Sequence, residues 1–599
     1  MSINKTTMRV TSKPTTLPES DLKEVTLQVP LYQREYSWDL EQISDLYYDI
    51  YNSTEESPHY LGSILVFDTG TVQEIIDGQQ RITTIFLILN CIKKILIENI
   101  HIDDERIRHS ITIIENYIYK RRSNKASNID TSTEPRLITS KRDKVLFKAI
   151  MQGTESNLLG STKEKKIKSH KLLLNANEAI TKKIASLFTT EGVNGLTIFL
   201  DKVIGCLFIV MTAEKKEDEV LLFKTLNSRG IELSESDLVK NEICNNVKVN
   251  NNKEYDDAKI QEAVDIWDDM RTKLEKNKVN IDYFIFYYIN SRDYSQQLRK
   301  EINSKFTTEK QNKDELFYPA IPEKLIFTAY ESLIRGTQNT LELLEGLNKS
   351  ADKYIEIYAP DEFLDKETKK ENKSYTFLRS IRDMNITKCY PLLLRGSETL
   401  STKNFDKLTK YVECLSFRHY ILKRDPKELE KFYYELTAKL KTDLDIETIL
   451  DAIKQHSSIK DEDRYMNEFI LCAPKSSISK MILTRLVNKQ EGLPHNHNDV
   501  HMDHIMPQKP TGTTAFAKLK KDNSENYENL NNRLGNLTLI KKKINISLSN
   551  KDFHEKKIGY KETRLKINDP LLNLDSWEFN NIEERQKALY ELAKDIWVL

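Results

Sequence analysis

The sequence predicts a predominantly helical α+β protein with two large domains and a helical segment between them. At 599 residues the chain is too long for a single hydrophobic core. Short apolar runs before residue 80 have the spacing of strands, whereas residues 256–454 carry leucine-rich stretches at helical spacing. We therefore expect an N-terminal domain over residues 1–250, a helical connector over 251–460 and a C-terminal domain over 461–599.

The composition is that of a soluble globular protein. Hydrophobic residues make up 39% of the chain and charged residues 30%, and no run approaches the roughly 18 uninterrupted apolar residues of a membrane span. Residues 1–18 are polar and lack the apolar core of a signal peptide, so the expected location is the cytoplasm. The six cysteines contain no C-x-x-C pair, which favours buried thiols over a zinc or redox site.

The first ordered block contains a predicted β-hairpin followed by a helix. The apolar runs Ser63–Asp68 and Val72–Ile76 flank Thr69-Gly70-Thr71, which is typical of a hairpin turn. Residues 82–97 are strongly apolar and contain neither Gly nor Pro, so we expect a buried helix there.

The motif Asp77-Gly78-Gln79-Gln80-Arg81 lies between the second strand and this helix. Gly78 permits close approach of the backbone, a helix N-terminus favours anions, and Arg81 adds a bidentate fork for a phosphate. The motif thus predicts a phosphate-binding turn. A purely structural interpretation is also available, in which Asp77 is the N-cap and Gln80 completes a capping box at the third helical position.

A second constellation lies near the C-terminus and suits phosphodiester hydrolysis. His504 titrates near neutral pH and can take a proton from water, so it is the candidate general base. Asp503 and Asn545 offer hard oxygen ligands, which predicts a Mg²⁺ or Mn²⁺ site. Asn536, directly after Gly535, is expected to bond the backbone around His504 and to fix the imidazole.

Asp503 and His504 are adjacent in the sequence, which raises a geometric difficulty. Neighbouring side chains of a regular strand point to opposite faces, so Asp503 and His504 serve one site only if the strand ends or bulges there. Pro507 favours an early end of the strand.

Basic residues are concentrated in this region although the whole chain is neutral. Lysine plus arginine and aspartate plus glutamate balance at 91 each, so overall charge does not support nucleic-acid binding. The local excess predicts a phosphate-binding face. Its members are Lys518, Lys520, Lys521, Arg533, Lys541, Lys542, Lys543, Lys551, Lys556, Lys557, Lys561, Arg564 and Lys566, and Lys541, Lys542, Lys543 and Lys551 are the predicted DNA contacts.

The C-terminal motifs resemble the DUF1524 branch of the HNH (ββα-metal) nucleases over roughly the last 120 residues. The resemblance implies a β-hairpin and a helix around one divalent ion, with the histidine as base. An asparagine stands at the position of the last histidine of the HNH motif, and the zinc-binding cysteine pairs of other HNH proteins are missing. The motifs are Asp503-His504-Ile505-x-Pro507-Gln508, Gly535-Asn536-Leu537-Thr538-Leu539 and Asn545.

The N-terminal half resembles the DUF262 family, which looks like the ParB/sulfiredoxin fold. Together with residues 77–81, the matching segments are 29–38, 60–64 and 223–234, and the match covers about residues 20–245. The family ties its DGQQR motif to nucleotide binding and hydrolysis. The nucleotide-binding residues implied here are Asp77, Gly78, Gln79, Gln80, Arg81, Gln33 and Arg34.

The order DUF262 then DUF1524 resembles GmrSD-like type IV restriction enzymes. It implies an NTP-regulated, modification-dependent DNA endonuclease of anti-phage defence, with a metal-assisted histidine base and NTPase activity in the N-terminal domain. The expected partners are modified phage DNA and a nucleoside triphosphate, without a membrane, and a homo-oligomer is left open. Two alternatives remain: a nucleotide-switched, partition-like DNA-binding protein with a structural nuclease remnant, and an RNA-directed toxin nuclease.

Overall fold

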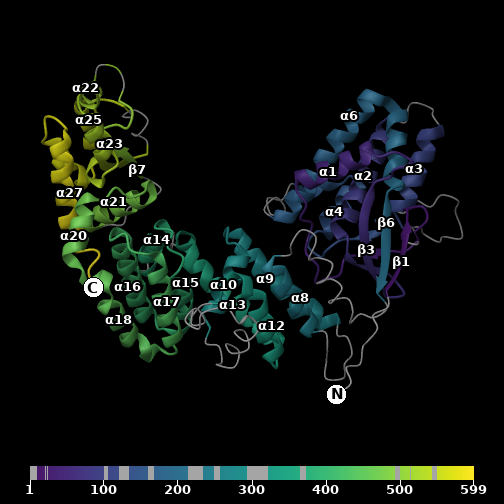
Figure 1. Ribbon diagram of the computed structural model, residues 1–599, viewed down its shortest axis with the longest axis horizontal. Helices are drawn as coiled ribbons and strands as arrows, with labels where there is room; N and C mark the ends of the chain where they lie inside the picture. The colour runs from purple at the N-terminus through teal and green to yellow at the C-terminus, as the bar shows by residue number, and fades with distance from the viewer. Residues whose placement is uncertain are drawn as a thin grey trace, which may run out of the picture. The chain divides into compact units, whose positions relative to one another are not determined.

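The computed structural model describes most of the chain as a helical α+β protein, as the sequence predicts. The described residues are 10–20, 22, 24–99, 105–120, 134–159, 167–213, 234–247, 257–292, 321–363, 373–492, 500–510, 512, 514–542 and 550–599. The chain divides into two compact units, which are Met1–Asp282 with Leu333–Asn348, and Tyr283–Ser332 with Lys349–Leu599 (Figure 1). No helix in the described part of the chain is long and apolar enough to span a membrane.

The first unit contains a six-stranded mixed sheet in the order β1-β6-β3-β4-β2-β5. The pairs β1·β6 and β3·β4 are antiparallel, and the pairs β3·β6, β2·β4 and β2·β5 are parallel. The strands are β1 (Val10–Thr15), β2 (Leu27–Gln28), β3 (Tyr60–Asp68), β4 (Gln73–Asp77), β5 (Leu137–Ile138) and β6 (Leu207–Ala213).

The predicted hairpin is confirmed as β3 and β4. Gly70 has a φ of +83° in the connecting turn, a conformation that glycine adopts without a steric penalty. Its N–H donates to the side chain of Asp68 at 2.7 Å, which closes the turn.

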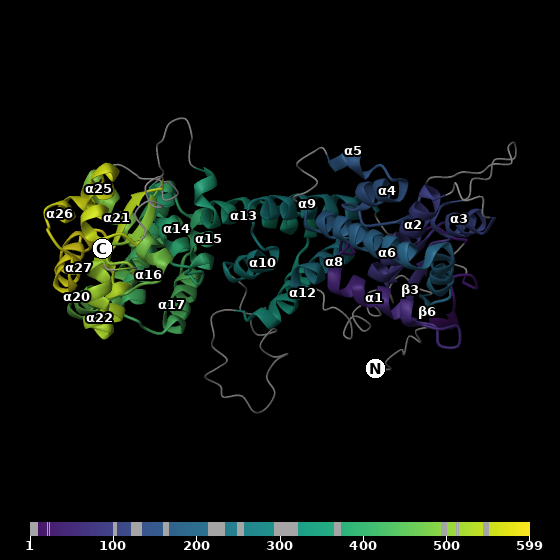
Figure 2. The same cartoon turned by 90° about the horizontal axis from the view of Figure 1, so that it is seen from above.

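Helices cover this sheet and supply most of the hydrophobic core of the first unit. The predicted buried helix is α2 (Gln79–Glu98), and it packs against α6 (Lys168–Ile204) and α3 (Glu105–Ile118). Because α2 is apolar on nearly all faces, it lies inside the unit rather than on its surface (Figure 2). The other helices of the unit are α1 (Leu40–Asn52), α4 (Lys144–Gln152), α5 (Glu155–Leu159), α8 (Glu235–Val247) and α9 (Asp257–Lys276).

The second unit is mainly helical. Helices α10 (Ile281–Asn290), α12 (Ile326–Gly336) and α13 (Thr340–Tyr358) contain the positions at which the two units divide. They are followed by α14 (Lys373–Asp383), α15 (Tyr390–Thr399), α16 (Thr402–Ile421), α17 (Pro426–Lys439), α18 (Ile446–Gln455), α19 (Ser457–Lys460), α20 (Glu462–Leu471) and α21 (Ser476–Glu491). Short 3-10 turns occur at Glu323–Leu325, Pro360–Phe363 and Asp443–Asp445.

The C-terminal part of this unit contains a two-stranded antiparallel sheet of β7 (Val500–His504) and β8 (Leu537–Lys541). The buried side chains around it form their own hydrophobic cluster, which includes Ile505, Ile540 and Trp577. The elements around the strands are α22 (Ala515–Asp522), α23 (Ser524–Asn531), the 3-10 turn η8 (Leu534–Asn536), α25 (Phe553–Thr563), the 3-10 turn Lys566–Asn568, α26 (Asp569–Leu572) and α27 (Phe579–Ala593).

Candidate active site

His504 is the last residue of β7, so the strand ends at the residue predicted to act as base. The pairing with β8 is regular, with Asp503 opposite Thr538 and His504 opposite Leu537. The two neighbouring side chains therefore lie on opposite faces. Asp503 is 6% exposed and faces α25, whereas His504 is half-buried. The strand ends without a bulge, and the two side chains do not converge on one point.

The imidazole of His504 is oriented by an amide pair. Its Nε2 lies 3.3 Å from Oδ1 of Asn532, and the same oxygen accepts a hydrogen bond from Nε2 of Gln508 at 3.0 Å. An amide oxygen can only accept, so Nε2 of His504 carries the proton and Nδ1 keeps the lone pair. Burial lowers the pKa of His504, which favours the neutral ring. Nδ1 is thus the atom that can take a proton.

Asn536 holds the backbone that follows His504. Its side chain is fully buried and makes four hydrogen bonds, with Met506 N (2.8 Å), Met506 O (2.9 Å), Asn531 O (2.8 Å) and Trp577 Nε1 (3.0 Å). The backbone oxygen of Asn536 also accepts from Ile505 N at 2.9 Å. These contacts place Asn536 behind the histidine, where it fixes the chain and offers no side-chain atom to a substrate.

The carboxylate of Asp503 is engaged by two residues of α25. Nζ of Lys556 lies 3.1 Å from each carboxylate oxygen and also donates to the backbone oxygen of His504 at 2.6 Å. The hydroxyl of Tyr560 donates to Oδ2 at 2.7 Å. The Lys556 side chain is fully buried, and its burial lowers its pKa while Asp503 opposes that effect.

The described residues do not present a divalent-ion site on Asp503. Three of the roughly four acceptor positions of this carboxylate are taken by Lys556 and Tyr560, and the ammonium group of Lys556 already supplies a positive charge next to it. Over the ranges that the structure describes, no group of three or more His, Cys, Asp or Glu side chains is arranged to hold a metal. The second predicted ligand, Asn545, lies outside the described residues, as does Lys543.

The predicted basic face is partly exposed. Lys541 and Lys542 are exposed at the end of β8, and Lys551 is exposed and lies 3.5 Å from Glu555. Lys556 is buried under β7 and so cannot belong to that face. The sequence did not distinguish Lys556 from the neighbouring lysines, because the face of α25 on which it lies is known only once the helix is known.

At the N-terminal motif the structural interpretation by capping is wrong in its details. The N-cap of α2 is Gly78, at φ 94°, and no side chain caps the helix. Asp77 instead pairs with Arg81 across 3.2 Å, and Arg81 also donates to the backbone oxygen of Leu61. A Cβ at Gly62 would lie 2.2 Å from Nη1 of Arg81, so glycine is required for this contact.

The three predicted glutamines tie residues 33–37 to the start of α2. Nε2 of Gln33 donates to Ile76 O at 2.9 Å, and Nε2 of Gln79 donates to Arg34 O at 2.7 Å. Gln80 accepts from Ser37 N at 2.9 Å and donates to the backbone oxygen of residue 35 at 3.1 Å. These side chains are buried, and their amides therefore shape the turn around the helix N-terminus.

Arg34 differs from Arg81 in having no hydrogen-bond partner for its guanidinium in the described part of the chain. It is half-buried, and its charge interacts with Asp237 of α8. Because its backbone oxygen accepts from Gln79, Arg34 lies next to the first residue of α2. Of the two predicted arginines, Arg34 is therefore the one whose guanidinium group can form a bidentate contact with an anion.

A buried charge cluster next to this turn was not predicted. Glu35 lies 2.6 Å from Arg271 and 3.7 Å from Arg142, and both arginines also pair with Glu275. Burial would raise the pKa of Glu35, but three cations, Arg271, Lys240 and Arg142, outweigh burial and lower it to about 2. Glu35 stands in the segment that the sequence singled out, whereas its partners are more than 100 positions away and carry no local signal.

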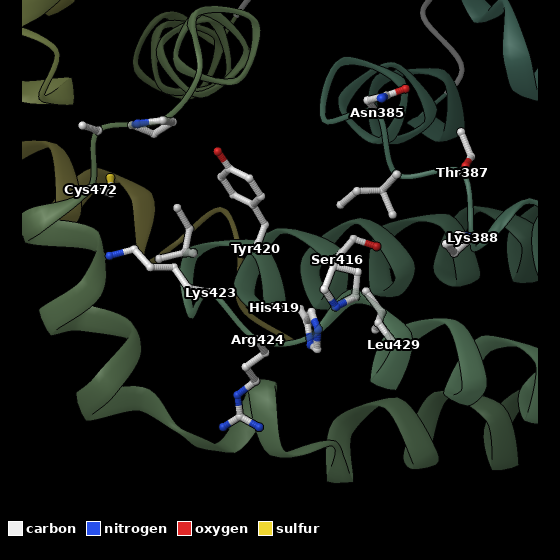
Figure 3. A pocket seen from close by; sticks show the side chains of 15 residues that line it. Asn385, Thr387, Lys388, Ser416, His419, Tyr420, Lys423, Arg424, Leu429 and Cys472 are labelled. Carbon is white, nitrogen blue, oxygen red and sulfur yellow. The ribbon is translucent and has the colours of Figure 1, made fainter.

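A separate cavity of about 470 Å³ lies in the second unit and contains none of the predicted site residues. Figure 3 shows Ser416, His419 and Tyr420 of α16 on one side and Asn385 and Thr387 on the other. Its wall at Cys472 is connected to the 3-10 turn η8, because Gln586 donates to Cys472 O at 2.9 Å and accepts from Gly535 N at 2.7 Å.

Two family models match the chain, one for each candidate site. The N-terminal domain of the GmrSD restriction endonuclease matches residues 18–244, and the C-terminal domain of GmrSD restriction endonucleases matches residues 457–592. A search of curated proteins found no match. The class of protein is therefore a nuclease with a restriction role in defence, and its substrate class is DNA. With its two halves in this order, the chain belongs to the GmrSD-like family of two-domain restriction endonucleases.

Proposed function

We propose that the protein is an NTP-regulated, modification-dependent DNA endonuclease of anti-phage defence in which His504 is the general base. The observation that carries the proposal is the positioned imidazole of His504, whose Nε2 is held by Asn532 and whose Nδ1 has no hydrogen-bond partner among the described residues. The arrangement of β7, β8 and α25 around it supports a ββα nuclease fold.

In the proposed reaction a water molecule attacks the scissile phosphorus and gives its proton to Nδ1 of His504. The new P–O bond forms as the bond to the leaving oxygen breaks, and that oxygen takes a proton from solvent. The lowered pKa of His504 keeps the ring neutral and ready to accept at neutral pH. Asn536 and Asn532 act by holding the histidine, one through the backbone and one through the ring.

A divalent ion, Mg²⁺ or Mn²⁺, is the cofactor expected for such a nuclease, and when bound it would stabilise charge on the phosphate. Its ligands would be oxygen donors other than Asp503, with Asn545 among them. EDTA should stop cleavage and leave the fold intact, which far-UV circular dichroism measures in the same sample.

The N-terminal unit is proposed to bind the nucleotide on a ParB-like domain, at the turn that precedes α2. Three features support this: the helix N-terminus at Gly78, which no side chain caps, the guanidinium of Arg34, which has no hydrogen-bond partner among the described residues, and the buried amides that fix the turn. NTPase activity, modified phage DNA as substrate and a cytoplasmic location complete the proposal.

Cleavage assays on three substrates test this function. Modified phage DNA, the same DNA without modification, and RNA are incubated with the full chain, with and without each NTP. Cleavage restricted to modified DNA and altered by an NTP is the expected result. Cleavage of RNA alone would indicate a toxin nuclease, and binding of DNA without any cleavage would indicate a partition-like protein.

A further inference from the structure

The sequence predicted that Asp503 is a metal ligand, but in the structure its carboxylate forms a buried ion pair with Lys556. Lys556 has no exposed side-chain surface, and its ammonium group reaches three acceptors: both oxygens of Asp503, each at 3.1 Å, and the backbone oxygen of His504, at 2.6 Å. An ammonium group has three donors, so every one of them has an acceptor here.

The carboxylate has three of its roughly four acceptor positions occupied. Asp503 accepts two contacts from Lys556 and one from the hydroxyl of Tyr560, whose oxygen is 2.7 Å away. A buried charge is stable only when it is paired and hydrogen-bonded, and removing one partner leaves the other uncompensated. Asp503 and Lys556 are therefore built as a pair.

A second buried cation lies beside the pair. Arg585 donates to Gly535 O at 2.9 Å and to Leu537 O at 2.6 Å, and its Nη2 lies 3.3 Å from the hydroxyl of Thr538. Thr538 is the register partner of Asp503 in β8. A buried guanidinium at Thr538 thus adds positive charge under the two strands, which disfavours a further cation there.

The contacts also show what the pair does. Lys556 belongs to α25 and Asp503 to β7, so the pair fastens the helix to the end of the strand. The bond from Lys556 to His504 O holds the backbone of the predicted base directly. Asn536 holds the next residues from the other side.

We infer that Asp503 is a positioning residue paired with Lys556, the resident cation of this site, and that it is not a ligand of the divalent ion. The inference rests on the proposed function, because it assigns Asp503 a part in orienting His504 for cleavage. Any divalent ion that the enzyme uses takes its ligands from other residues.

Mn²⁺ binding to the full chain tests the inference without a cleavage assay. The free ion is measured by electron paramagnetic resonance for wild type, Asp503→Asn, Lys556→Met and the double variant, with Asp522→Asn as the control for loss of an exposed carboxylate. Asp503→Asn should bind Mn²⁺ within twofold of wild type. Lys556→Met should gain Mn²⁺ affinity by tenfold or more, because it frees the carboxylate, and the double variant should lose that gain.

A tenfold loss of Mn²⁺ affinity in Asp503→Asn, absent in Asp522→Asn, would overturn the inference, as would a Lys556→Met variant without the gain. Crystals of the wild-type chain soaked in MnCl₂ give a readout that needs no variant to fold. Anomalous scattering should show no Mn²⁺ on Asp503, and an ion on its carboxylate with Lys556 displaced would refute the proposal. Failure of the proposed function appears separately, as absence of DNA cleavage by wild type.

Discussion

At the level of single residues, the chemistry of His504 depends on its burial and on one amide neighbour. Burial lowers the pKa of the ring below its ordinary value of 6.5. A general base works when it is unprotonated, so cleavage falls only when the pH drops through that lowered pKa. We predict that kcat/KM for DNA cleavage is flat from pH 7 to 8 and declines on the acid side with a midpoint below 6.5. A pH–rate profile measures this, and a midpoint above 7 would contradict the assignment.

Asn532 sets the tautomer of His504, and its variants should separate orientation from charge. Asn532→Ala removes the acceptor at Nε2, and we expect kcat at neutral pH to fall about tenfold to hundredfold, because the ring is no longer aligned. Asn532→Asp places a carboxylate there, which stabilises the protonated ring and moves the acid limb to higher pH. The exposed Asn526→Asp in α23 is the matched control. An acid limb that stays in place in Asn532→Asp would refute the contact.

At the level of elements, the turn after β7 depends on Asn536. Asn536→Ala leaves the buried backbone groups of Met506 and Asn531 and the indole N–H of Trp577 with fewer partners. We predict a loss of about 3–5 kcal/mol in the free energy of unfolding of the C-terminal part, together with loss of cleavage. Urea unfolding followed by tryptophan fluorescence measures it. The exposed Asn526→Ala should cost less than about 0.5 kcal/mol. A loss of less than about 1 kcal/mol in the free energy of unfolding of Asn536→Ala would show that the turn is stable without the hydrogen bonds of Asn536.

Local sequence patterns predicted the elements that are defined by neighbouring residues. The hairpin of β3 and β4 and the buried helix α2 followed from turn residues and from apolar runs without Gly or Pro. The burial of the cysteine thiols followed from their spacing and surroundings. The N-cap at Gly78 was missed because local capping preferences favour Asp77. In the structure Gly78 has a left-handed conformation, and Asp77 forms an ion pair with Arg81 instead.

The partners of the candidate sites could not be predicted, because they come from distant positions. Lys556 stands 53 positions from Asp503, and Arg271 stands 236 positions from Glu35. In the sequence Lys556 is one lysine among many in a basic stretch. Only the helical phase of α25 and its packing under β7 turn that lysine inward.

At the level of the whole molecule, the proposal requires that a nucleotide on the first unit alters cleavage by the second. Arg34→Ala removes the guanidinium beside α2 that has no hydrogen-bond partner in the described part of the chain, and Arg81→Ala removes the guanidinium that binds Asp77 and Leu61. We predict that Arg34→Ala weakens NTP binding at least tenfold with the fold unchanged, and that Arg81→Ala weakens it as well. Both variants should change the NTP dependence of DNA cleavage, because coupling requires different nucleotide affinities in two states of the protein.

Isothermal titration with each NTP and parallel cleavage assays measure these two effects. Normal nucleotide binding by both variants would refute the site at the start of α2. Lost binding together with cleavage that still responds to NTP as in wild type would refute the coupling between the units.

The central claim is that this chain cuts DNA with His504 as its base. Cleavage of modified phage DNA by wild type and by His504→Ala tests it most directly, with circular dichroism and the thermal midpoint of both proteins recorded beside the rates. We predict that wild type cleaves, and that His504→Ala, with an unchanged spectrum and midpoint, loses about a thousandfold or more of the rate. A folded His504→Ala protein that cuts the same DNA at a rate close to that of wild type would contradict the account.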